Sequence, residues 1–180
     1  MRVARFFIVA GLLAGPANAE PVTGPVVPGH GPVYYVPEEP LAWPAGQTLK
    51  AAFDIAGAPD APAEPNTRFE TVARYLNMHA RAGVAPDQLP VAIVLHGRAT
   101  RSALHPDVFE ERYGESHPDA GLLQLLQAAG VRIVVCGQSA TAFGFDPSEF
   151  APGIDMSLSA MTSLVALQSD GYALIPWGQD

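Results

Sequence analysis

The fold of this chain is indicated by the stretch Leu89-Pro90-Val91-Ala92-Ile93-Val94-Leu95-His96, an apolar run that ends on a histidine. A short run that is apolar almost throughout is typical of a β-strand covered on both faces. The flanking sequence has the spacing of amphipathic helices, with Phe69, Val72, Ala73, Leu76 and Ala80 before the run and Leu122, Leu123, Leu125 and Leu126 after it. This order predicts a strand that alternates with helices, as in parallel sheets.

The same alternation continues along the rest of the chain. Further strands are predicted at 49–55, 131–135, 155–158 and 172–175, and helices at 66–82, 118–129, 140–143 and 160–169. The polar stretch 96–118 holds only one predicted helical turn, at 108–113. Five strands that alternate with helices indicate an α/β fold, with a mostly parallel sheet and helices on both faces.

Residues 1–19 predict a cleaved secretory signal peptide. Arg2 and Arg5 precede an apolar run at 6–14, and Ala17-Asn18-Ala19 has the small-residue pattern of a cleavage site. The alternative is a membrane anchor, but the run falls short of the roughly 20 residues that a spanning helix needs. We therefore expect a periplasmic protein that begins at Glu20 and has no membrane attachment after cleavage.

Residues 20–46 are dense in proline and glycine, which prevents a persistent helix or central strand. They predict an extended arm in front of an α/β domain at 47–180. The aromatic side chains of the arm, Tyr34, Tyr35 and Trp43, are expected to pack on the domain or on a neighbouring subunit.

Charge and motifs exclude several function classes. The 180 residues carry 18 acidic and 10 basic side chains, a net charge of −8. This balance argues against a nucleic-acid partner, because binding to phosphates requires clustered Lys and Arg. The Gly-x-Ser-x-Gly motif of hydrolases and the glycine-rich loops of nucleotide sites are absent, so no cofactor is expected. His96, His105 and His117 lack the spacing of a metal site, and no metal is predicted.

The residues that follow the strands are the candidates for chemistry, because ligands bind outside the carboxyl ends of parallel strands. These residues are Asp54, His96, Cys136 and Ser159. Consecutive strands are usually neighbours in such sheets, which would bring His96 and Cys136 to one edge.

Cys136 is the only cysteine, so an internal disulfide is excluded. Gly137 permits close backbone approach, and Ser139 is the expected N-cap of the next helix, whose amides would favour a thiolate. His96 and Arg98 would add to this effect when they are positively charged. The alternative, that Cys136 only completes a buried strand, stays open. We treat Cys136 and His96 as catalytic candidates and expect the ligand site to include Gly97, Arg98, Gly137, Gln138, Ser139 and Ser159.

Three separated motifs resemble the DsrE/DsrF-like family. They are Val91-Ala92-Ile93-Val94-Leu95-His96-Gly97, Val134-Val135-Cys136-Gly137-Gln138-Ser139, and Ser159-Ala160-Met161-Thr162 together with Gly171-Tyr172-Ala173-Leu174-Ile175-Pro176. The resemblance implies a three-layer α/β/α domain with a five-stranded parallel sheet, usually assembled into trimers or hexamers. It also implies that a cysteine at the position of Cys136 accepts and passes on persulfide sulfur.

Two hypotheses follow from the sequence. In the first, this is a periplasmic DsrE-like protein whose Cys136 binds or relays sulfane sulfur, or senses thiol oxidation, with a small sulfur species or a thiol protein as its partner. In the second, it is a non-catalytic homo-oligomeric module that binds a small ligand. The residues alone leave open whether the protein is an enzyme.

Overall fold

The computed structural model describes residues 20–36 and 47–176. The core is a five-stranded sheet in the order β4-β3-β2-β1-β5, and every pairing is parallel. The strands are β1 (Ala51–Ile55), β2 (Val91–Leu95), β3 (Arg132–Cys136), β4 (Ile154–Ser157) and β5 (Ala173–Pro176). The predicted leader (1–19), residues 37–46 of the predicted arm and residues 177–180 lie outside the described residues.

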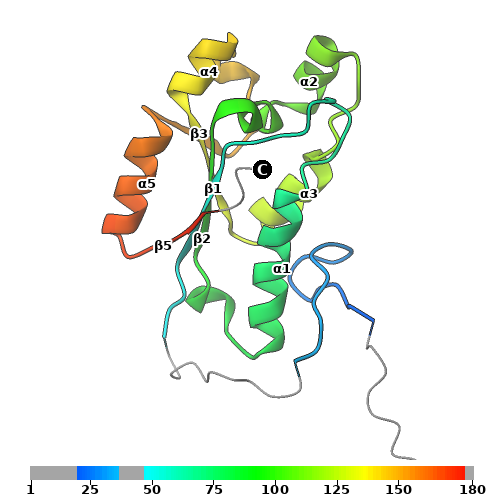
Figure 1. Cartoon of the computed structure of the whole chain (residues 1–180), viewed down its shortest axis with the longest axis vertical. Helices are drawn as coiled ribbons and strands as arrows, with labels where there is room; N and C mark the ends of the chain where they lie inside the picture. The colour runs from blue at the N-terminus through cyan, green and yellow to red at the C-terminus, as the bar shows by residue number, and fades with distance from the viewer. Residues whose placement is uncertain (1–19, 37–46, 177–180) are drawn as a thin grey trace, which may run out of the picture.

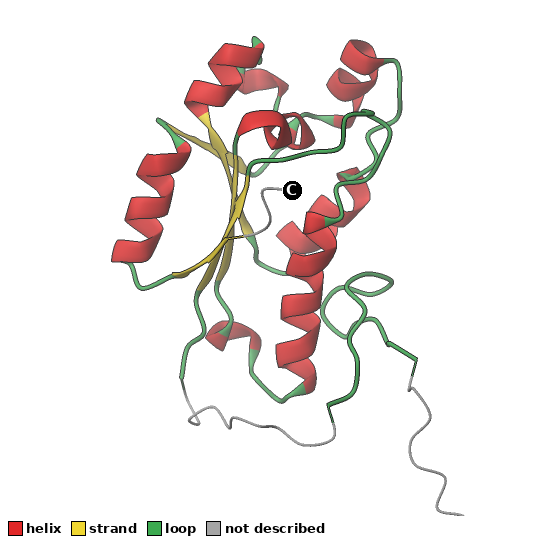
Figure 2. Ribbon diagram, in the orientation of Figure 1, coloured by secondary structure: helices red, strands yellow, loops and turns green. Residues whose placement is uncertain are grey.

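Helices cover both faces of the sheet and confirm the three-layer α/β/α fold (Figure 1). Helices α1 (Arg68–Arg81) and α3 (Ala120–Ala128) lie on one face, and α5 (Ala160–Ser169) lies on the other (Figure 2). The large side chains of the strands, among them Phe53, Ile93 and Ile133, pack in the same core as α1 and α3. The opposite face carries the small residues Ala52 and Ala92 near α5, which packs against all five strands.

The polar stretch between β2 and α3 contains more regular structure than its sequence indicates. It forms a seven-residue 3-10 helix, η2 (Gly97–Ala103), and an α-helix, α2 (Pro106–Tyr113). Short 3-10 helices also occur at η1 (Pro86–Gln88) and η3 (Pro147–Glu149). Helix α4 (Gly137–Phe143) follows β3 directly, and a small core of Leu104, Phe109, Ala140 and Phe145 holds these segments together beyond the carboxyl ends of the strands.

Residues 20–36 differ from the extended arm that their composition predicts. Val22 and Val33 form an antiparallel bridge with hydrogen bonds of 3.0 and 2.9 Å, so the segment closes into a loop. Asn77 of α1 binds this loop through its side chain. Its Oδ1 accepts from the amides of Val26 and Val27, and its Nδ2 donates to the carbonyls of Val27, His30 and Gly31. Because these backbone groups find partners on α1, the loop docks there and buries Val27 completely.

The aromatic residues of this segment do not pack on the domain in the way the sequence suggested. Tyr34 and Tyr35 are 64% and 76% exposed, and Trp43 lies outside the described residues. Packing of the two tyrosines against a neighbouring subunit stays a prediction.

Candidate functional site

Cys136 is the last residue of β3 and lies beside Ser157 of β4 in the sheet register. It is also the N-cap of α4, since its Sγ accepts the amide of Ser139 at 3.5 Å. This corrects the expectation that Ser139 would be the N-cap: the helix begins at Gly137, three residues earlier than that cap would place it. Gly137 must be a glycine, because a Cβ there would lie 2.6 Å from the carbonyl oxygen of Ser157.

The surroundings of the Cys136 sulfur favour its thiolate. Burial on its own raises the pKa of this thiol, but hydrogen bonds from the hydroxyl and amide of Ser139 and from the amides of Ala160 and Gln138 outweigh it. The pKa of Cys136 therefore lies below its ordinary value. Although the residue is only 4% exposed, neutral polar donors surround its sulfur, in contrast to the purely apolar surroundings of an inert core cysteine.

Helix α5 supplies one of these donors from the opposite side of the strand end. Ser159 is its N-cap, and the Ser159 Oγ accepts the amide of Thr162 at 3.1 Å. The amide of Ala160, the first residue of the helix, is thereby left to face Cys136. Ser159 is buried, and it contributes to the site by fixing the start of α5. Gln138, on α4, is exposed to solvent.

His96 follows β2 at the same edge of the sheet. Its Nε2 lies 2.8 Å from Oδ1 of Asp54 on β1, and both side chains keep about a third of their surface exposed, at 30% and 28%. The next residue, Gly97, has a φ of +52°, and its amide donates to the Ser139 Oγ at 3.0 Å. Ser139 therefore links the turn after His96 to the sulfur of Cys136.

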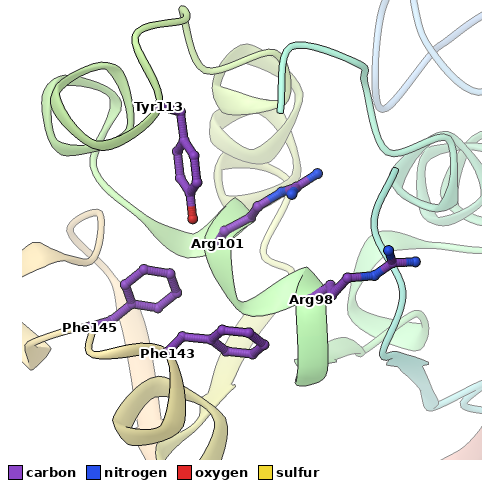
Figure 3. Close-up of a pocket in the computed structure, with 5 residues that line it drawn as sticks. All are labelled: Arg98, Arg101, Tyr113, Phe143 and Phe145. Atoms are coloured by element: carbon purple, nitrogen blue, oxygen red, sulfur yellow. The ribbon is translucent and has the colours of Figure 1, made fainter. Parts of the chain in front are cut away.

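Arg98 is directed away from this cluster. Its guanidinium pairs with Asp60, and Arg101 donates to the carbonyl of Pro59, so both arginines hold the loop that follows β1. A cavity of about 140 Å³ lies behind them, lined by their side chains and by Tyr113, Phe143 and Phe145. In Figure 3 both guanidinium groups point away from the two phenylalanine rings, which form the apolar side of this cavity.

The other two histidines weighed as metal ligands have structural partners. His105 caps α2, with its Nδ1 accepting the amide of Asp107, and His117 Nε2 donates to the carbonyl of Ser102. Burial lowers the pKa of His117 despite this bond. Over residues 20–36 and 47–176, no group of three His, Cys, Asp or Glu side chains could hold a metal ion. In the same part of the chain, no helix combines the length and apolar character needed to cross a membrane.

The fold and the site together define a class: parallel α/β/α domains with a cysteine at the carboxyl end of a central strand, beside a histidine. The model of the DsrE/DsrF-like family matches residues 50–177, which contain all five strands. The chain belongs to this family, as its three motifs indicated.

Two solved structures have the same fold. A protein of unknown function from Methanobacterium thermoautotrophicum, MTH1491, is 19% identical with a TM-score of 0.53, covering 72% of this chain and 99% of its own. The ychN protein from E. coli is 16% identical with a TM-score of 0.52, covering 72% of this chain and 100% of its own. Among curated proteins, none matches the chain.

The structure brings together the predicted residues Cys136, His96, Gly97, Gly137, Gln138, Ser139 and Ser159, while the guanidinium of Arg98 lies elsewhere. Sequence reasoning identified Asp54 only as a residue at a strand end and missed its bond to His96. The signal was available, since Asp54 is the one charged residue in an otherwise apolar strand. The amide of Ala160 had no such signal, because any residue type supplies a backbone donor.

Proposed function

We propose that this protein accepts and passes on sulfane sulfur through Cys136. The observation that carries the proposal is the set of neutral donors around the sulfur, which lowers the pKa of the thiol at the carboxyl edge of the sheet. Membership of the DsrE/DsrF-like family supports a sulfur-relay role. In the transfer, the thiolate attacks the outer sulfur of a persulfide R–S–SH, the S–S bond of the donor breaks, and R–S⁻ leaves. The step involves no external oxidant or reductant.

The test is direct because the chain contains one cysteine. The protein is incubated with glutathione persulfide, and its intact mass is measured before and after addition of a thiol. We expect a gain of one sulfur atom that the thiol removes and that Cys136→Ser abolishes. An unchanged mass of the wild-type protein would overturn the proposal. A parallel incubation with hydrogen peroxide measures thiol oxidation, the other use of a stabilised thiolate.

A second candidate function is a homo-oligomeric module in which Cys136 has no chemical role. It is favoured by the exposed apolar side chains on and beside α5, namely Met156, Leu158, Met161, Val165 and Leu174. Helix α5 carries no charged residue at all, which is unusual for a helix that faces water. Under this hypothesis, Cys136→Ala leaves ligand binding and assembly unchanged.

The same surface supports assembly under either function. We propose that the protein is a homo-oligomer, a trimer or hexamer, in which this surface is a subunit contact. Val165 is 65% exposed, so Val165→Glu places a charge in the contact without disturbing the core. Light scattering is expected to show a multimer for the wild type and a smaller species for the variant. A wild-type monomer would refute this part of the proposal.

The compartment is a separate proposal. The charged start, short apolar run and small-residue motif of residues 1–19 support export to the periplasm with cleavage before Glu20. Expression with this leader followed by cell fractionation and N-terminal sequencing tests it. A cytoplasmic protein that keeps its first 19 residues would contradict it.

A further inference from the structure

Asp54 and His96 form a pair of ionisable side chains beside Cys136. The two residues come from the central strands β1 and β2, and their side chains are joined by the 2.8 Å contact between Oδ1 and Nε2. Both are partly exposed to solvent, whereas Cys136 is nearly covered. Asp54 interrupts an otherwise apolar strand, and a charged residue in such a strand is seldom covered unless it is paired.

The pair lies on the same face of the sheet as the sulfur. Leu95 of β2 pairs with Val135 of β3, so His96 and Cys136 are the next residues on neighbouring strands. His96 keeps an extended backbone, with φ −147° and ψ 179°, and its side chain therefore continues the alternation of β2. Cys136 packs with Val94 on the α5 face, the face that this alternation also assigns to His96.

Asp54 determines which nitrogen of His96 carries the proton. A carboxylate oxygen only accepts hydrogen bonds, so Nε2 must donate to Asp54. In the neutral imidazole the proton is then on Nε2, and Nδ1 has a free lone pair. Among the residues that the structure describes, none makes a hydrogen bond to Nδ1 of His96.

Few other ionisable groups face this imidazole. Helices α4 and α5 contain none. On η2, Arg98 and Arg101 are directed at the loop after β1, where Arg98 pairs with Asp60. The other ionisable groups at this edge are Asp54, which His96 contacts on β1, and Cys136, which follows Val135 on the neighbouring strand β3. In this environment His96 is the group suited to carry a proton to or from the sulfur.

We propose that His96 is the proton carrier for sulfur exchange at Cys136 and that Asp54 is its positioning residue, an inference that rests on the proposed function. Nδ1 takes the proton of the Cys136 thiol, and the thiolate attacks the outer sulfur of R–S–SH. The S–S bond of the donor breaks as the new one forms. The leaving R–S⁻ takes the proton from Nδ1, so the products are the Cys136 persulfide and R–SH. Asp54 stabilises the imidazolium that exists between these two transfers.

The test compares two carboxylates that each pair with a basic side chain. Asp54→Asn removes the charge beside His96, and Asp60→Asn is the matched control, because within residues 20–36 and 47–176 Asp60 pairs only with the exposed Arg98. Sulfur uptake from glutathione persulfide is timed by intact mass between about pH 5 and about pH 9, where an imidazole titrates. The ¹⁵N NMR signals of the His96 ring report its tautomer in the same samples.

We expect His96→Gln to slow uptake by about a hundredfold and Asp54→Asn by about tenfold, each with a changed pH profile. Asp54→Glu should restore part of the rate, and Asp60→Asn should match the wild type. If the wild type takes up sulfur but Asp54→Asn and Asp60→Asn behave alike, the inference fails while the proposed function stands. A wild type that takes up no sulfur contradicts the function itself. A proton on Nδ1 of neutral His96 overturns the inference even if the variants fail to fold.

Discussion

Removal of the Ser139 hydroxyl should raise the pKa of Cys136. This hydroxyl and the amide of the same residue both stabilise the thiolate, and Ser139→Ala deletes the first while keeping the second. A hydrogen bond to a charged group contributes about 1.5–3 kcal/mol. One pKa unit corresponds to about 1.4 kcal/mol, so the pKa of the thiol should rise by about one to two units.

The assay is the rate of iodoacetamide alkylation from about pH 5 to about pH 10, because only the thiolate reacts. With a single cysteine in the chain, the intact mass reports the modification of Cys136 alone. Below the pKa, each unit of increase lowers the thiolate fraction, and therefore the rate, by about tenfold.

Ser157→Ala is the control. Ser157 lies beside Cys136 in the sheet, but its hydroxyl is bonded to the carbonyls of Val135 and Ser159 and not to the sulfur. Its removal should leave the alkylation profile in place. The reasoning is refuted if Ser139→Ala does not move the profile, or if Ser157→Ala moves it by as much.

Three further predictions concern stability. Gly137→Ala should destabilise the protein by about 1–3 kcal/mol in urea unfolding, because the added Cβ would lie 2.6 Å from the carbonyl oxygen of Ser157. Gly121→Ala is the control and should not destabilise the protein, since no heavy atom lies within 4 Å of a Cβ at that position. Asn77→Ala should release the N-terminal loop from α1, and amide exchange at Val26 and Val27 should accelerate strongly while the core strands remain protected. Burial lowers the pKa of His117 from 6.5, so the unfolded chain binds a proton at this imidazole more readily than the folded chain does. The free energy of unfolding should therefore decrease as the pH drops below about 6.5, and His117→Gln should reduce that decrease.

The strands were predictable because a parallel sheet leaves a simple trace in the sequence. Each central strand is a short apolar run, and the predicted run at 131–135 corresponds to β3 at Arg132–Cys136. Helix α5 was predicted with its observed bounds, since Ser159 and Gly171 mark its ends. Where hydrophobic periodicity and end signals agree, element type and position follow from the residues.

Tertiary contacts explain what the sequence could not show. The loop at 20–36 is held on the domain by Asn77, a residue about fifty positions away on α1, and no local pattern indicates such a partner. The helix α2 and the 3-10 helix η2 are likewise held by contacts with residues after β3, among them Ala140 and Phe145. A polar, proline-containing sequence therefore predicts a loop until its distant partners are known.

The sulfur site departs from its sequence prediction in a way that affects its chemistry. The sequence suggested positive charge from Arg98 near Cys136, but this guanidinium is paired with Asp60, and the groups that lower the pKa of the thiol are uncharged donors. Donors of this kind stabilise a thiolate without supplying a proton, because a backbone amide does not titrate. The proton that we propose for the departing thiolate therefore comes from a titratable group, the imidazole of His96, which Asp54 orients at the same edge of the sheet.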